Sequence, residues 1–273
     1  MPAAFGLSVS SVSRRFVRAS ARHLRTFCER RLEREEFVAL VLDGKTFADE
    51  AMVIALGITL QGQKKVLGFV QTATENERVC AAFLRELSER GLQADHGLLK
   101  ALQAVFARRA VVQRCQWHKR ENVLAYLPKA QHPTWRRKLQ AAYAQPRYDQ
   151  VKAALLAVRE APRLVNASAG ASLDEGLEET LALHRLGLFP VLGVSLKTTN
   201  CLESFHVQPG QITDKVDRWR IADQKHRCVA SALLTMELRL RRIQGYRHVP
   251  LLRAVLQADI GRAESAEGIS VAG

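Results

Sequence analysis

Residues 38–72, VALVLDGKTFADEAMVIALGITLQGQKKVLGFVQT, carry the pattern that decides the fold. Three apolar runs rich in β-branched residues, Val38–Leu42, Met52–Leu60 and Val66–Gln71, alternate with turn-forming spacers. This alternation predicts a three-stranded antiparallel meander. Because the first run is apolar on both faces, we expect it to be a central strand.

Asp43 directly follows the first run and precedes Gly44. Asp-Gly is ordinary turn chemistry, so one interpretation makes Asp43 a turn residue. A carboxylate beside a buried strand is otherwise uncommon unless it binds a metal ion or meets a basic partner. The dipeptide by itself favours the turn, and both interpretations stay open at this point.

The composition indicates a folded, basic protein. With 273 residues and 47% hydrophobic content, the chain can bury a sizeable core. Its formal net charge of +14 favours a polyanionic partner such as nucleic acid. The five cysteines are scattered and do not suggest a disulfide framework. No signal peptide and no apolar run of roughly 18 residues is present, so we expect a cytoplasmic protein that does not enter a membrane.

Helical and strand patterns flank the meander. Residues 6–32 predict an amphipathic helix whose arginines include Arg14, Arg15 and Arg18. This helix is similar to the DNA-reading helix of a helix-turn-helix, or it is a solvated lead-in helix. After the meander we expect a helix that ends at Gly91, a helix at Gly97–Ala107 and a buried strand at Ala110–Cys115. Strands interleaved with helices predict a mixed α/β sheet.

The rest of the chain has mainly helical periodicity. Residues 119–197 predict a block of helices, and a further helix begins near Cys201 after Thr198-Thr199-Asn200. A last strong helix is expected from Asp223 to about Ile243. The small, polar residues from Ala258 to Gly273 are expected to form a loose tail.

Three further groups of residues could carry chemistry. Cys115 and His118 have the spacing of half a zinc site, but no second pair follows, so packing or hydrogen bonding explains them better. Glu203 lies in the first turn of a helix, where the helix dipole favours negative charge. Basic residues interleaved with an aromatic residue suit contact with nucleic acid, or form a solvated basic face. These basic and aromatic residues are Lys215, Arg218, Trp219, Lys225 and Arg227.

The order of these motifs resembles that of the Mutator-type transposases of bacterial insertion sequences. The motifs are LVLDGKTF, QRCQWHKREN, TTNCLES, KVDRW, QKHR and GYRH, and the resemblance covers roughly residues 6–256. It implies an α/β (α+β) fold with a ribonuclease H-like mixed sheet and an all-helical insertion before the helix that carries Glu203. It also implies a DNA transposase that performs metal-dependent cleavage and strand transfer at insertion-sequence ends.

The resemblance also implies roles for particular residues. Asp43 and Glu203 match the first and third members of an Asp-Asp-Glu triad that binds Mg²⁺ (or Mn²⁺). Cys115 and His118 match a structural Cys-x-x-His motif. The implied partners are insertion-sequence ends and target DNA, with a homo-oligomer or an intact transposase as a protein partner. The implied location is the bacterial cytoplasm, in association with the nucleoid.

The chain departs from the family pattern where the second Asp is expected. The passage from Leu92 to Leu99 leaves no room for a strand of about five residues followed by Asp-Gly. We therefore expect an internal deletion that removes one core strand and the second catalytic Asp. Asp95 lies nearby and is the candidate replacement. Pro209-Gly210 interrupts the helix expected after Glu203.

The expected organisation follows from these departures. The N-terminus is expected to be truncated, with residues 1–36 as the remnant of a helical DNA-binding region. The catalytic domain would comprise residues 37–118 and 198–257, with the insertion at 119–197 and a flexible tail at 258–273. Two functions stay open: a DNA transposase, defective in this copy, or a catalytically inactive DNA-binding remnant of one.

Overall fold

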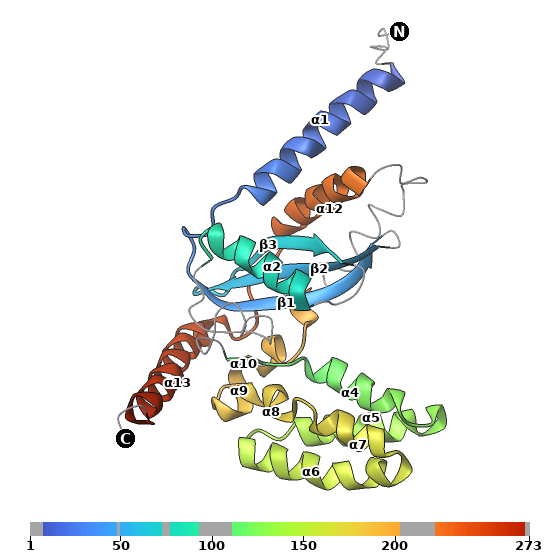
Figure 1. Ribbon diagram of the computed structural model, residues 1–273, viewed down its shortest axis with the longest axis vertical. Coiled ribbons are helices and arrows are strands. Elements are labelled where there is room, and N and C mark those ends of the chain that lie inside the picture. Colours follow the sequence, from blue (N-terminus) through green and yellow to red (C-terminus); the bar gives the residue numbers. More distant parts are fainter. Residues whose placement is uncertain (1–7, 48–49, 73–76, 93–110, 203–221, 271–273) are drawn as a thin grey trace.

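The computed structural model describes residues 8–47, 50–72, 77–92, 111–202 and 222–270. Figure 1 shows a small sheet in the middle of the molecule, with α1 and α12 on one side and a group of helices on the opposite side. Among the described helices, none combines the length and the apolar character that crossing a bilayer requires. The elements are α1 (Val9–Cys28), β1 (Phe37–Phe47), β2 (Glu50–Thr59), β3 (Lys64–Gln71), α2 (Glu77–Glu89), α4 (Gln116–Ala125), η2 (Lys129–Gln131), α5 (His132–Tyr143), α6 (Tyr148–Val165), α7 (Ala167–Asp174), α8 (Leu177–Thr180), α9 (Ala182–Arg185), α10 (Phe189–Leu196), α12 (Ala222–Glu237), η3 (Tyr246–His248) and α13 (Val249–Ser270).

The meander predicted from the sequence is confirmed. β1 and β3 both pair antiparallel with β2, in the order β1-β2-β3. Within the described residues, the first strand lies at an edge of this sheet and β2 is its central strand, contrary to our expectation. β1 is apolar on both faces because side chains from two different cores cover it.

Each face of the sheet packs against its own core. Val41 and Ile54 face a cluster that includes residues of α10, α12 and α13. Leu40, Ala55 and Leu67 face a smaller cluster beneath α2. This two-sided burial is what positions the polar side chains of β1.

The turn between β2 and β3 requires a glycine. Gly62 has φ +74°, and its N–H donates to the carbonyl of Thr59 at 2.7 Å. A Cβ at this position would overlap Tyr246, so glycine satisfies both the left-handed conformation and the close packing. The carbonyl of Gly62 accepts the N–H of Ile243 at 3.0 Å.

The helices from α4 to α8 pack around a hydrophobic core of their own. That core contains Trp135, Leu139, Leu155 and Leu173 and is separate from the two clusters of the sheet. In Figure 1 these helices lie together, in green to yellow, on the side of the sheet opposite α1.

Three local expectations were wrong. Residues 111–115 are not in a strand, because Arg114 and Gln116 donate their backbone N–H groups to carbonyls of the helical group, Glu179 at 2.8 Å and Lys197 at 2.9 Å. The helix expected to reach Ile243 ends at Glu237, because the N–H of Ile243 donates to the carbonyl of Gly62 in the β2–β3 turn. α13 continues to Ser270, so residues 258–270 are helical rather than a flexible tail.

Candidate active site

Asp43 lies within β1 rather than at its end. Its backbone pairs with Ile54 of β2, and the ladder continues through Gly44 to Phe47. The turn interpretation was therefore wrong, because pairing with β2 overrides the local preference of Asp-Gly for a turn. Side chains alternate along a strand, so Asp43 shares its face with Val41 and with its partner Ile54. Its side chain is half-buried.

The segment that leads to Glu203 packs on this same face. A helix begins at Asn200, where the backbone N–H donates to Oγ1 of Thr198 at 3.3 Å, as the N-cap pattern predicted. Cys201 and Leu202 are buried in the cluster that contains Val41. The chain therefore brings Asp43 and the residues directly before Glu203 into one core.

Electrostatics support this proximity. Burial raises the pKa of the Cys201 thiol to about 11; the Lys64 ammonium opposes the rise, and the Asp43 carboxylate adds to it. Nζ of Lys64 also donates to the carbonyl of Cys201 at 3.4 Å. Asp43, Lys64 and Cys201 thus converge from β1, β3 and a helix more than 130 residues away. The Asp43 carboxylate supplies oxygen donors to this locality.

Cys115 and His118 lie at the start of α4, next to the turn that precedes Cys201. Cys115 is the N-cap residue of α4, and its Sγ lies 3.9 Å from Oγ1 of Thr199. Burial raises the pKa of Cys115, but hydrogen bonding to His118 and to the backbone of Thr199 outweighs it, so the net pKa is lowered. The next residue, Gln116, donates its N–H to Lys197. These contacts join the start of α4 to the turn that precedes Cys201.

The start of α12 lies on the Asp43 face as well. The His226 ring packs on Phe69 of β3 with centroids 5.8 Å apart, and Phe69 pairs with Ile54, the partner of Asp43. Lys225 and Arg227 flank this histidine and are partly exposed. Of the proposed DNA-binding residues on α1, Arg14, Arg15 and Arg18 are all exposed.

Other sequence-based candidates lie outside the described residues. Their mutual geometry is therefore untested, and they remain predictions: Asp95, Glu203, Lys215, Arg218 and Trp219. Among the residues that the structure describes, no group of three or more His, Cys, Asp or Glu side chains could hold a metal ion. The Asp43 carboxylate fits Mg²⁺ or Mn²⁺ in donor type, since both ions prefer oxygen.

Sequence analysis missed Lys64 and Cys201 as neighbours of Asp43. Lys64 is the first residue of β3, and alternation along that strand would have placed it on the face of Val66. Nothing in the sequence indicated that Lys64 and Asp43 both lie beside the helix start at Cys201. Only the packing of the Cys201–Leu202 segment reveals this.

The fold and the site define a basic α+β protein in which a strand carboxylate faces a helix start from a distant part of the chain. A profile described as "Transposase, Mutator family" matches residues 3–215, and the chain therefore belongs to the Mutator family of transposases.

Individual relatives agree with this assignment. The chain is 28% identical over 214 residues to the transposase for insertion sequence element IS6120 of Mycolicibacterium smegmatis, which covers 73% of this chain and 65% of that protein. It is 31% identical over 218 residues to the transposase for ISRM5 of Rhizobium meliloti, with 72% of this chain and 51% of that protein covered. The transposase for IS256 in transposon Tn4001 of Staphylococcus aureus is 31% identical over 170 residues, with 55% and 40% covered. The chain spans less than two thirds of the length of these relatives.

Proposed function

We propose that this chain binds DNA as a Mutator-family transposase and retains only part of the metal site for strand transfer. In this proposal the sheet is the first part of a ribonuclease H-like domain, and Asp43 and Glu203 are the remaining triad carboxylates. The observation that carries the proposal is the burial of Cys201 and Leu202 on the face of β1 that presents Asp43. Glu203 follows these two residues directly in the sequence.

The residues around Asp43 have distinct tasks in this proposal. Mg²⁺ or Mn²⁺, when bound, activates a water or 3′-hydroxyl and stabilises the oxygens of an in-line phosphoryl displacement. Asp43 supplies one carboxylate from a paired strand, which holds the side chain in a fixed place. Lys64 fixes the helix start through the carbonyl of Cys201. Cys115 and Thr199 support the preceding turn.

The proposal assigns this copy a defect in catalysis. The sequence between Leu92 and Leu99 is too short for the expected strand and second Asp, and two carboxylates fix metal geometry poorly. Asp95 is the residue that would have to replace the second Asp. The alternative is a protein with no metal site, which only binds DNA through its basic surface. The short Leu92–Leu99 segment is the observation that favours this alternative.

Metal binding separates the proposal from this alternative. Mn²⁺ titration followed by electron paramagnetic resonance should show a weak site that is lost in Asp43→Asn and Glu203→Gln. The control is Asp149→Asn, which removes an exposed carboxylate on α6 and should leave Mn²⁺ binding unchanged. Equal Mn²⁺ binding by the wild-type chain and Asp43→Asn would establish the inactive alternative.

Strand transfer tests the defect. The full chain is incubated with Mg²⁺ or Mn²⁺, DNA that carries the ends flanking its own gene, and a plasmid target. We expect DNA binding without joined product. Product formation that disappears in Asp43→Asn would overturn the assignment of a defect and show an active transposase.

A further inference from the structure

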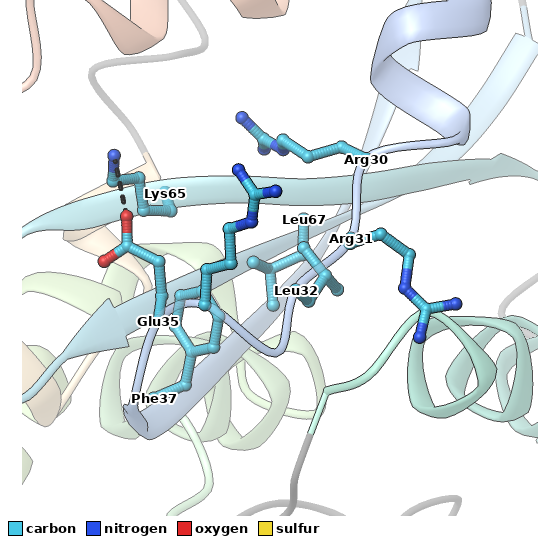
Figure 2. Close-up of a pocket in the computed structure, with 8 residues that line it drawn as sticks. Arg30, Arg31, Leu32, Glu35, Phe37, Lys65 and Leu67 are labelled. Carbon is cyan, nitrogen blue, oxygen red and sulfur yellow. Dashed lines mark ion pairs between the residues drawn. The ribbon is translucent and has the colours of Figure 1, made fainter.

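A cavity of about 360 Å³ lies at the edge of β3, away from the candidate active site. Its walls come from the linker between α1 and β1 and from β3 itself. The lining residues are Arg30, Arg31, Leu32, Arg34, Glu35, Phe37, Lys65 and Leu67. Figure 2 shows Leu32 and Leu67 between the linker and the strand, Lys65 beside Glu35, and the guanidinium of Arg31 pointing away from the others.

The cavity is basic around an apolar floor. Four cationic side chains and one carboxylate line it. Glu237 pairs with Arg30 and Glu33 pairs with Arg31 from outside the lining, so a formal surplus of one positive charge remains. Leu32, Phe37 and Leu67 form the floor and are almost fully buried. This combination fits an anionic group attached to an apolar body. A free inorganic anion would leave the floor uncovered.

Two of the cationic side chains, Arg34 and Lys65, are available to bind a ligand. Within the described part of the chain, Arg34 has neither a hydrogen bond nor an ion pair. Lys65 pairs with Glu35 at 3.2 Å, but both side chains are about one-third exposed, so this pair is weak and can yield to an anion.

Arg30 is held in place but keeps one donor unused. Its two terminal nitrogens bind Glu237 and the carbonyl of Val66. Its Nε–H is buried and has no hydrogen-bond partner in the described residues. Because this Nε–H is closed to solvent, Arg30 lines the cavity as a fixed charge and not as a free donor.

The floor of the cavity belongs to the opposite face of the sheet from Asp43. Phe37 and Leu67 are in the cluster beneath α2, whereas Val41 and Ile54, which share the Asp43 face, are in the other cluster. A ligand in this cavity is therefore separated from Asp43 by the thickness of the sheet.

We propose that this cavity binds a backbone phosphate and the adjoining deoxyribose of a DNA segment other than the one at Asp43. This inference rests on the proposed function, because it takes DNA as the partner. The net charge of +14 and the arginines of α1, the helix that leads into the linker, favour DNA over an acidic peptide. The volume suits one nucleotide unit, because ligand sites begin at about 300 Å³.

The test compares two double variants of the full chain with equal reduction of positive charge. Arg34→Gln with Lys65→Gln removes two cations from the cavity. Arg137→Gln with Lys138→Gln removes two exposed cations from α5 and is the matched control. Binding of a fluorescent duplex, and of a single strand of the same sequence, is measured by anisotropy across a salt series without divalent metal. Thermal melting by circular dichroism verifies that both variants fold.

We expect the cavity variant to bind about tenfold more weakly at low salt, because charge-assisted hydrogen bonds to phosphate are removed. The salt slope should fall by about 0.9 for each duplex phosphate that the variant no longer neutralises, or by about 0.7 for each phosphate of a single strand. The control should keep the wild-type slope.

Several outcomes would overturn the proposal. These are equally weakened binding in the two double variants, unweakened binding in the cavity variant, and no binding of DNA by the wild-type chain. Displacement of the labelled DNA by polyglutamate as effectively as by unlabelled DNA of equal charge would assign the cavity to acidic peptides instead. An unchanged cavity variant beside a wild-type chain that binds DNA and Mn²⁺ would refute this inference and leave the proposed function standing.

Discussion

The thiol of Cys115 lies 3.9 Å from the hydroxyl of Thr199 and joins the start of α4 to the turn before Cys201. Cys115 therefore contacts the turn that contains Thr199 and is also the N-cap residue of α4. His118, one turn along α4, interacts with the same sulfur. This local pairing explains the Cys-x-x-His spacing.

His118→Ala should raise the pKa of Cys115. Burial raises that pKa, and the side-chain hydrogen bond of His118 is the largest opposing cause, so its removal leaves burial opposed only by the backbone hydrogen bonds of His118 and Thr199. The measurement is the alkylation rate of Cys115 against pH, followed by peptide mass spectrometry. Cys28 in the same sample is an internal control, because burial and nearby Glu86 raise its pKa independently of His118. An unchanged alkylation midpoint at Cys115 would refute the pairing.

Glu237→Ala should destabilise the fold by about 2–3 kcal/mol. Oε2 of Glu237 accepts the N–H of Val66 at 2.7 Å, and Oε1 pairs with Arg30 at 2.7 Å, in a site where Glu237 is only 14% exposed. The variant leaves both donors without this acceptor at the edge of β3. Urea unfolding measures the destabilisation, with Arg147→Ala as a control that breaks the exposed Arg147–Asp149 pair and should change stability by less than about 1 kcal/mol. Similar destabilisation in the two variants would contradict the prediction.

Glu175→Gln should lose less stability in acid than the wild type does. Hydrogen bonds from Lys119 and Arg114 lower the pKa of Glu175 to about 2 from 4.5. A lowered pKa contributes stability above the unfolded value, and this contribution disappears as pH falls from 4.5 towards 2. Because the Glu175 side chain is 58% exposed, we expect only about 1 kcal/mol after solvent screening.

The check is the free energy of unfolding of Glu175→Gln and wild type across this acid range. The curves should converge at the lowest pH at which the protein remains folded. Glu160→Gln is the control, since this glutamate also pairs with an arginine but lies on the exposed side of α6. A gap between wild type and Glu175→Gln that persists through the acid range would show that the effect is not electrostatic.

His184→Leu should make the protein less sensitive to mild acid. The His184 ring is buried and stacks on Phe189 with centroids 3.7 Å apart, and neither ring nitrogen has a hydrogen-bond partner in the described residues. Burial lowers its pKa, against the opposing effect of backbone groups of Gln145 and Tyr143 that do not reach hydrogen-bond geometry. Charging the ring therefore opposes folding, and stability should fall as pH drops below about 6.5.

Thermal melting against pH measures this effect. The melting temperature of the wild type should decrease below that pH more than that of His184→Leu. The exposed His248 provides a control through His248→Gln, which should follow the wild type. Parallel curves for the wild type and His184→Leu would remove His184 as the cause.

Sequence periodicity predicted the local elements well where one pattern dominates. The meander, the Gly62 turn and the helix that ends before Gly91 follow from apolar alternation and from glycines with positive φ. The turn interpretation of Asp43-Gly44 was wrong because a dipeptide preference is weaker than pairing along a whole strand. Residues 111–115 were misassigned because a short apolar run is also compatible with a partly buried coil whose N–H groups bond to a neighbouring helical group.

Long-range placement could not be predicted. The cavity beside Arg34 and Lys65 combines a linker with the edge of β3, and neither segment contains a motif for a site. The continuation of α13 through Ser270 was missed because its small and polar residues carry a weak amphipathic pattern. The resemblance of the ordered motifs was required to associate Asp43 with Glu203.

Asp43→Asn should lower the pKa of Cys201, which tests the placement of the candidate site without any catalytic assay. Burial is the main cause of the raised value of about 11, the Lys64 ammonium lowers it, and the Asp43 carboxylate raises it. Removing the carboxylate charge should therefore shift the thiol pKa downward, and Lys64→Gln should shift it upward. The readout is the rate at which a small thiol-specific reagent modifies Cys201 across pH, and Asp149→Asn should leave that rate unchanged. Opposite shifts in Asp43→Asn and Lys64→Gln would place both charges beside Cys201. If neither variant moves the profile, Asp43 does not face the helix that leads to Glu203, and the proposed metal site loses its geometric basis.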